Sequence, residues 1–175
     1  MVAPESYGRF FRWAHRLILP AVGRRAAAIT TVSEFSRAQL AAHGVAPPGK
    51  IAVTYNGSDH VDRWDENLSD LPHRSDWPYV FCLGQQQRYK NMELIARLAP
   101  VLECMGLDLM IAGDADPARL FPGRNGKPAN VRLTGRIGDN DLKAMLANAL
   151  CFLFPSRIEG FGLPAIEAMA AGCPV

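Results

Sequence analysis

The stretch that decides the fold is CFLFPSRIEGFGLPAIEAM, residues 151–169. It begins as an apolar run of strand length, breaks at Pro155, and passes through two glycines into an alanine-rich helix. Pro164 suits the first turn of that helix, where a missing backbone N–H costs nothing. The helical spacing predicts one apolar face, made of Leu163, Ile166 and Ala170.

The two glycines of this stretch, Gly160 and Gly162, lie where a strand–loop–helix unit can bind an anion. Glycine lets the backbone approach a ligand, and the free N–H groups and dipole at a helix start favour negative charge. Glu159 on the loop and Glu167 in the helix flank the junction, and carboxylates accept hydroxyl pairs better than they bind phosphate. The pattern indicates a sugar nucleotide; the plainer alternative is an ordinary strand–turn–helix with two solvated glutamates.

With seven residues between Glu159 and Glu167 and Gly-Phe-Gly-Leu-Pro inside, the segment resembles the signature of the retaining glycosyltransferases of family 4. These are two-domain GT-B enzymes whose second domain binds the nucleotide-sugar donor. The resemblance implies that Glu159 faces the donor sugar and that Glu167 holds the ribose hydroxyls. It also implies that backbone lines the sugar and phosphate pocket at Gly160, Phe161, Gly162 and Leu163.

The composition is that of an ordinary soluble globular protein. Of 175 residues 49% are hydrophobic and 21% charged, and the net charge of +2 says little about partners. No apolar run approaches the roughly 18 residues of a membrane span, and no secretory signal opens the chain. The four cysteines lack metal-ligand or redox spacing, and three lie in or beside apolar runs, so we expect buried thiols in a reducing cytoplasm. They are Cys82, Cys104, Cys151 and Cys173.

The stretch from Tyr7 to Val22 is predicted to form a basic amphipathic helix. Its apolar residues recur at helical spacing: Phe10, Phe11, Ala14, Leu17, Ile18 and Ala21. Its other side is basic, with Arg9, Arg12, Arg16, Arg24 and Arg25. Such a helix either packs on a domain with its arginines in solvent or lies on an anionic membrane. The second interpretation adds peripheral membrane association to the expected partners.

The next segment is predicted to be a strand followed by a capped helix. Residues 26–32 have strand character, Ser33 is an N-cap, and Gly44 is a C-cap. The sequence TTVSEFS at residues 30–36 resembles the last strand-to-helix turn of a family 4 acceptor domain.

A domain boundary is expected shortly after this helix. A proline-rich linker precedes a strand at residues 51–55, and Asn56-Gly57 resembles the crossing between the two domains of the family. We therefore expect residues 1–47 to be the end of an acceptor domain and residues 48–175 to be most of the nucleotide-sugar-binding domain. The polar stretch at residues 61–78 is predicted to be a loop containing a short helical turn.

A buried strand ends at Gly84 and leads into a loop with two cations. Lys90 lies at a strand–loop–helix junction, where lysine is suited to phosphate, and the resemblance assigns it to the donor pyrophosphate. Many relatives carry arginine directly after the glycine; this chain has Gln85, and Arg88 is the substitute we consider. A solvated surface lysine is the plain alternative for Lys90. The following helix is expected to have an apolar face of Leu94, Ile95, Leu98, Val101 and Leu102.

Three further strands are predicted, at residues 107–112, 131–134 and 150–154. The resemblance implies that the backbone after the second of these receives the nucleotide base, with Gly135, Arg136 and Ile137 as candidate contacts. Asp139 is then expected to cap a helix.

Strands that alternate with helices predict a parallel sheet covered on both faces. The expected class is therefore α/β, a Rossmann-like open parallel sheet of the GT-B donor domain, preceded by a helix–strand–helix remnant. Such sheets bind ligands at the C-terminal ends of their strands, where the candidate ligand groups fall. No Gly-x-Gly-x-x-Gly follows the first strand of this sheet, which disfavours a dinucleotide oxidoreductase.

The predicted function is that of a retaining hexosyltransferase, which moves a sugar from a nucleoside diphosphate donor to a glycan or lipid-linked acceptor in polysaccharide or glycan biosynthesis. Glu159, Lys90 and Arg88 are the candidate catalytic residues, and no metal, cofactor or nucleic acid is expected. A GT-B epimerase or phosphorylase and a non-catalytic nucleotide-sugar-binding module remain alternatives. Since the resemblance begins within an acceptor domain, we expect this chain alone to keep donor-site geometry with little or no turnover.

Overall fold

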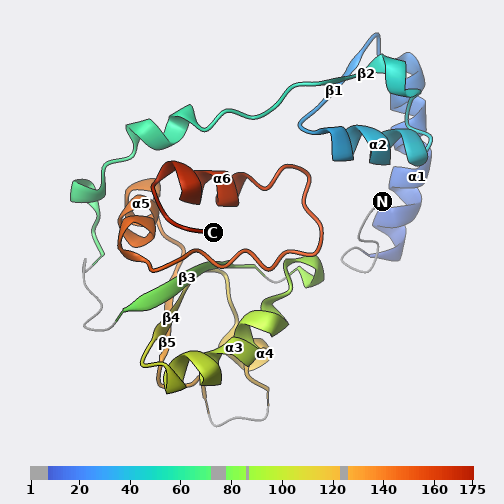
Figure 1. The fold of residues 1–175 in the computed structure, drawn as a ribbon. Helices are drawn as coiled ribbons and strands as arrows, with labels where there is room; N and C mark the ends of the chain where they lie inside the picture. Colours follow the sequence, from blue (N-terminus) through green and yellow to red (C-terminus); the bar gives the residue numbers. More distant parts are fainter. Residues whose placement is uncertain (1–7, 72–77, 86, 123–125) are drawn as a thin grey trace. The chain divides into compact units, whose positions relative to one another are not determined.

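The computed structural model describes residues 8–71, 78–85, 87–122 and 126–175 (Figure 1). The chain divides into two compact units. The first contains the residues up to Gly57 together with Ile158–Gly162, and the second contains Ser58–Arg157 and Leu163–Val175.

The first unit is a small parallel α/β arrangement. Its elements are α1 (Arg9–Arg25), β1 (Ile29–Thr31), α2 (Glu34–Ala42), the 3-10 turn η2 (Pro48–Lys50) and β2 (Ile51–Val53). Strands β1 and β2 pair in parallel, with Ile29 opposite Ile51. The predicted N-cap is confirmed, because the Ser33 side chain accepts a hydrogen bond from the Ser36 N–H at 3.0 Å. Gly44 has φ +68° just after the helix, as a C-terminal glycine should.

Helix α1 packs through its C-terminal end. A Cβ on Gly23 would lie 1.8 Å from the Val45 carbonyl oxygen, so the close approach requires glycine there. The Lys50 ammonium donates to the carbonyls of Gly23 at 2.9 Å and Arg24 at 3.1 Å, which places a cation at the helix C-terminus. The predicted apolar face is largely exposed, with Phe10, Phe11, Leu17 and Ile18 in solvent. No described helix has the length and hydropathy to cross a bilayer.

The second unit contains the main sheet and most of the helices. Its elements are the 3-10 turns η3 (Asp59–Arg63), η4 (Glu66–Leu68) and η5 (Arg88–Lys90), the strands β3 (Tyr79–Gly84), β4 (Asp108–Gly113) and β5 (Val131–Gly135), and the helices α3 (Met92–Cys104), α4 (Pro117–Leu120), α5 (Asp139–Asn148) and α6 (Leu163–Ala170). The strands are parallel in the order β3-β4-β5, visible side by side in Figure 1. Within the predicted loop at residues 61–78, η4 is the short helical turn, and residues 72–77 lie outside the described part of the chain.

The predicted strand at residues 150–154 is only partly formed. It runs parallel to β3 through an isolated bridge between Phe152 and Phe81, with the Leu153 N–H donating to the Phe81 carbonyl at 2.7 Å. On its other side the Phe152 N–H donates to the carbonyl of Pro174 at 2.7 Å. Because proline has no backbone N–H, Pro174 accepts this hydrogen bond and donates none.

Two hydrophobic clusters lie on opposite faces of the main sheet. Side chains along a strand alternate between faces, so Val80 and Cys82 of β3 join the cluster of α3, while Tyr79 and Phe81 join that of α5 and α6. Burial raises the pKa of the Cys82 thiol to about 12. The α/β class with helices on both faces of a parallel sheet is confirmed.

The helices bury narrower faces than their spacing predicted. In α3, Ile95 and Leu102 are buried together with Ala99, whereas Leu94 and Val101 are exposed. In α6, Ala168 is the fully buried position, and the predicted Ala170 is exposed. Each helix buries one narrow stripe, which consists of Met92, Ile95, Ala99 and Leu102 in α3 and of Ala168 in α6. The apolar residues at the margins of that stripe remain in solvent.

The start of α5 differs from the prediction. Gly138, not Asp139, is the N-cap residue, and the cap is supplied by Asp141 three residues later. The Asp141 carboxylate accepts from the Gly138 N–H at 3.3 Å, the Ser69 hydroxyl at 2.7 Å and the Asp70 N–H at 2.9 Å. The Ser69 hydrogen bond is the largest cause that lowers the pKa of Asp141. One carboxylate therefore caps α5 and holds the residues that follow η4.

Candidate functional site

The C-terminal ends of the three main strands are built from glycine. Gly84 is paired with Gly113, and Gly135 with Ala112 of β4. Gly113 has φ +109°, and a Cβ there would lie 2.5 Å from the Gly84 carbonyl oxygen. A Cβ on Gly84 would lie 2.7 Å from a methyl group of Ile111. Packing alone therefore requires the glycine at Gly84, which we also predict to bind the donor.

The loop after β3 lies against the segment that leads into the Glu159 motif. The Asn91 amide donates to the Pro155 carbonyl at 3.2 Å, and Arg157 donates to the Asn91 side-chain oxygen at 3.2 Å. The Arg157 N–H also donates to the Tyr89 carbonyl at 2.8 Å. Two loops that are more than 60 residues apart in sequence thus meet at the C-terminal edge of the sheet.

The Lys90 ammonium lies near one aromatic ring from each of these two loops. Its ammonium is 5.9 Å from the Phe154 ring centroid and 5.4 Å from that of Tyr89. The predicted residues Gln85 and Arg88 of the same loop are exposed. Lys90 is half-buried, and the two aromatic rings hold its ammonium group in position through cation–π contacts.

Sequence reasoning missed the role of Asn91. Asn91 directly precedes α3, but its side chain makes no cap bond. It adopts the left-handed conformation, with φ 55° and ψ 38°. This frees its amide to tie the two loops together. The available signal was the residue type, because asparagine tolerates this region better than other non-glycine residues do.

The ends of β4 and β5 are joined by an exposed ion pair. The Arg136 guanidinium donates to both oxygens of Asp114, at 2.7 Å from Nη2 and at 3.0 Å from Nε. These hydrogen bonds lower the pKa of the Asp114 carboxyl. Gly135 has φ +72°, and Ile137 packs half-buried against the cluster of α5 and α6. Of the three predicted base contacts, Arg136 is thus engaged with Asp114 and Ile137 with the core.

The loop of the Glu159 motif belongs to the first unit. The Gly160 carbonyl accepts from the hydroxyls of Ser33 and, at 3.4 Å, Ser36 at the start of α2. Phe161 packs against Tyr55 with ring centroids 6.3 Å apart. Glu159 is half-buried, and Gly162, with φ +83°, ends the loop.

The predicted site residues therefore fall into two groups. Glu159, Gly160, Phe161 and Gly162 group with the first unit. The second unit holds Gly84, Gln85, Arg88, Lys90, Gly135, Arg136, Ile137, Leu163 and Glu167. Within the second unit the structure brings Lys90 to the segment leading into the motif.

Glu167 is held by a residue that sequence reasoning did not select. The His60 imidazole Nε2 lies 2.8 Å from the Glu167 Oε1. Both side chains are mostly buried, with exposed fractions of 29% and 13%. His60 also packs edge-on against Trp64, with ring centroids 5.3 Å apart at 67°. No local sequence pattern predicts this contact, because the two residues are 107 positions apart.

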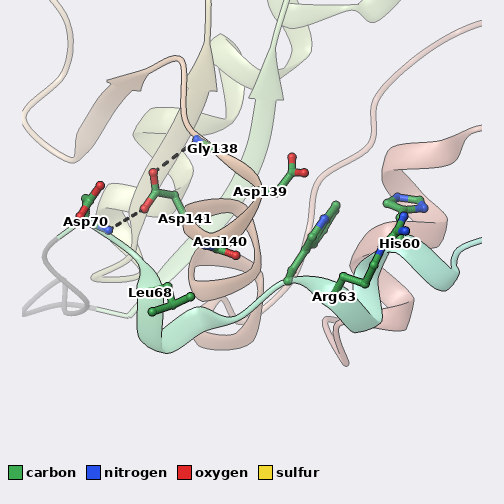
Figure 2. A pocket seen from close by; sticks show the side chains of 9 residues that line it. His60, Arg63, Leu68, Asp70, Gly138, Asp139, Asn140 and Asp141 are labelled. Atoms are coloured by element: carbon green, nitrogen blue, oxygen red, sulfur yellow. Dashed lines mark hydrogen bonds between the residues drawn. The ribbon is translucent and has the colours of Figure 1, made fainter.

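A surface hollow lies beside the start of α5 (Figure 2). Its volume is about 550 Å³, and it is lined by His60, Arg63, Trp64, Leu68, Asp70, Gly138, Asp139, Asn140 and Asp141. Three aspartates against one arginine make it unsuited to a diphosphate. Across the described ranges, no three histidine, cysteine, aspartate or glutamate side chains gather as a metal site.

Comparisons with known proteins agree with this fold. The family model of glycosyl transferases group 1 matches residues 65–175. The O-antigen chain mannosyltransferase B of Escherichia coli is 30% identical over 159 residues, which cover 84% of this chain and 42% of that protein. The GDP-mannose:cellobiosyl-diphosphopolyprenol alpha-mannosyltransferase of Komagataeibacter xylinus is 29% identical over 145 residues, or 79% and 35% of the two chains. The Anabaena protein HepE, solved with UDP and glucose, superposes with a TM-score of 0.67 at 19% identity, covering 99% of this chain and 49% of that one.

The parallel sheet, its helices on both faces and the superposition on HepE define the GT-B fold. The chain belongs to the glycosyl transferases group 1. The resemblance drawn from the Glu159–Glu167 segment is thereby confirmed at the level of the family. The chain spans about two-fifths of the length of the curated relatives it matches first.

Proposed function

We propose that this chain supplies the donor-binding half of a retaining glycosyltransferase. The whole protein would move a hexose from a nucleoside diphosphate sugar to a hydroxyl of a glycan or lipid-linked acceptor. Family membership supports sugar transfer. One relative is named for GDP-mannose, so GDP is the nucleotide we expect to bind most tightly. Acceptor contacts would lie in the part of those relatives that this chain does not span.

The observation that carries the proposal is the placement of Glu167. Its carboxylate is only 13% exposed, on the first helix after the motif, and a mostly buried carboxylate needs hydrogen-bond donors. A ribose diol supplies two such donors. Lys90, placed by its aromatic neighbours in the same unit, is the cation for the diphosphate. Glu167 would therefore bind the ribose, and Lys90 would bind the diphosphate, of the same nucleotide.

The proposed chemistry is electrostatic. Lys90, assisted by Arg88 and the N-terminus of α6, would stabilise the negative charge that develops on the leaving diphosphate. Glu159 would face the donor sugar. We propose that the transfer needs no metal ion, that it takes place in the cytoplasm, and that the basic helix α1 bears on a membrane-bound acceptor.

Two other functions remain open. A GT-B epimerase or phosphorylase would release a different product from the same donor, so product analysis of the whole protein separates it from a transferase. A binding module without catalysis would bind the nucleotide sugar and leave it intact.

Calorimetric titration of the chain with GDP, UDP and ADP tests the donor site. We expect one nucleotide to bind, and Glu167→Ala to weaken it tenfold to a hundredfold, because a charge-assisted hydrogen bond contributes about 1.5–3 kcal/mol. Glu93→Ala is the matched control, since that carboxylate is exposed on α3 and pairs with Arg97. Equal affinities for the wild-type chain and Glu167→Ala would contradict the proposal.

A further inference from the structure

The pairing of His60 with Glu167 uses only one of the two carboxylate oxygens of Glu167. Oε1 is 2.8 Å from the imidazole, and no described residue hydrogen-bonds Oε2. A carboxylate accepts only, so His60 Nε2 carries the proton of this bond. The Glu167 side chain is mostly buried, but its second oxygen is not among the enclosed unpaired atoms of the described residues, so a ligand can reach it. The pair therefore presents one oxygen that is fixed in direction and available to a ligand.

His60 is itself held rigidly. It lies on η3, whose Val61 is buried and whose next residue, Trp64, is buried as well. The Lys143 ammonium donates to the Trp64 carbonyl at 2.8 Å, which ties this turn to α5. The Trp64 ring packs against the imidazole. Figure 2 shows His60 and its neighbour Arg63 on this turn. The imidazole is thus fixed before any ligand arrives.

We infer that His60 is a positioning residue, which orients the Glu167 carboxylate so that Oε2 receives the hydroxyl pair of a ribose. This inference rests on the proposed function, because it takes Glu167 to be the ribose acceptor. The Nε2–H bond to Oε1 fixes the plane of the carboxylate and so removes rotational freedom that ribose binding would otherwise have to freeze. Preorganisation of this kind favours binding without a contact between His60 and the nucleotide.

The test compares the nucleotide that binds most tightly among GDP, UDP and ADP with its 2′,3′-dideoxy form. In the wild-type chain we expect the dideoxy form to bind at least about tenfold more weakly, since it lacks the hydroxyls that Glu167 accepts. Glu167→Ala should bring that ratio to about one. His60→Ala should lower the ratio to a few-fold, and it should have no further effect in the Glu167→Ala background. His60→Gln, whose amide can still donate, should restore part of the ratio.

The outcomes separate the two claims. If the folded wild-type chain binds no nucleotide, or Glu167→Ala leaves the hydroxyl ratio unchanged, the proposed function fails and this inference with it. If Glu167→Ala removes the ratio while His60→Ala and His60→Gln both keep it at the wild-type value, the positioning role alone is wrong. An effect of His60→Ala that persists in the double variant would likewise overturn it. His43→Ala, in an exposed histidine of the first unit, is the control.

Discussion

Two side-chain pairs in the second unit each join a basic side chain to a carboxylate, and their surroundings differ. Arg136 and Asp114 join the ends of β5 and β4, with side chains 82% and 58% exposed. His60 and Glu167 join η3 to α6, with side chains 29% and 13% exposed. The first pair is bidentate and uses both carboxylate oxygens. The second uses one oxygen and leaves the other without a protein partner among the described residues.

The Arg136–Asp114 pair joins two strand ends, whereas the His60–Glu167 pair has an oxygen that can bind a ligand. An exposed pair is screened by solvent and contributes little to stability. A mostly buried carboxylate with an unused oxygen has a desolvation cost that a ligand can offset. A position at the C-terminal edge of the sheet thus does not by itself identify a binding residue. Glu167 is a candidate because its side chain is mostly buried and one of its carboxylate oxygens has no described protein partner.

The largest loss of stability is expected for a substitution of Gly113, which directly precedes Asp114 at the end of β4. Gly113→Ala would force φ +109° on alanine and place a methyl group 2.5 Å from the Gly84 carbonyl oxygen, so we expect unfolding to become easier by more than about 3 kcal/mol. Urea denaturation measures this. Gly106→Ala, with φ +70° and nothing within 4 Å, is the control and should cost only about 1–2 kcal/mol. Similar losses for both variants would contradict the packing argument.

A smaller effect is expected at the carboxylate that caps α5. Asp141→Ala removes the α5 cap and the bonds to Ser69 and Asp70, so we expect a loss of about 1–2 kcal/mol in urea denaturation. The folded pKa of Asp141 lies below its ordinary value of 3.8, so its contribution is present above that pH and is lost as the pH falls further. Asp139→Ala, at the neighbouring exposed carboxylate, is the control. A stability difference between wild type and Asp141→Ala that stays constant down to pH 2 would contradict this linkage.

The smallest effect is expected at the exposed pair itself. Arg136→Ala should leave the free energy of unfolding nearly unchanged, because solvent screens both charges. The pKa of Asp114, followed by NMR titration, should rise toward its ordinary value once the Arg136 hydrogen bonds are lost. An unchanged Asp114 pKa would mean that the two side chains are not paired in solution.

The sequence predicted what depends on neighbours along the chain. Glycine at the end of each main strand and Ser33 as a cap are local patterns that the structure contains, whereas the strand before Pro155 is only partly formed. It could not predict contacts between distant segments. The Asn91 bridge to Pro155 and the His60 bond to Glu167 link residues 64 and 107 positions apart, and no periodicity encodes them. The predicted apolar faces of the helices were wider than the buried ones. Helical spacing identifies the apolar residues on one side of a helix, but it does not show which of them contact the sheet.

A crystal structure of the chain with the nucleotide that binds most tightly would show whether a nucleoside diphosphate binds through Glu167 and Lys90. We predict the ribose hydroxyls on Oε2 of Glu167, with Oε1 still bonded to His60, and the diphosphate beside Lys90. A nucleotide found instead in the hollow lined by Asp70 and Asp139, or bound without contact to Glu167, would contradict the account.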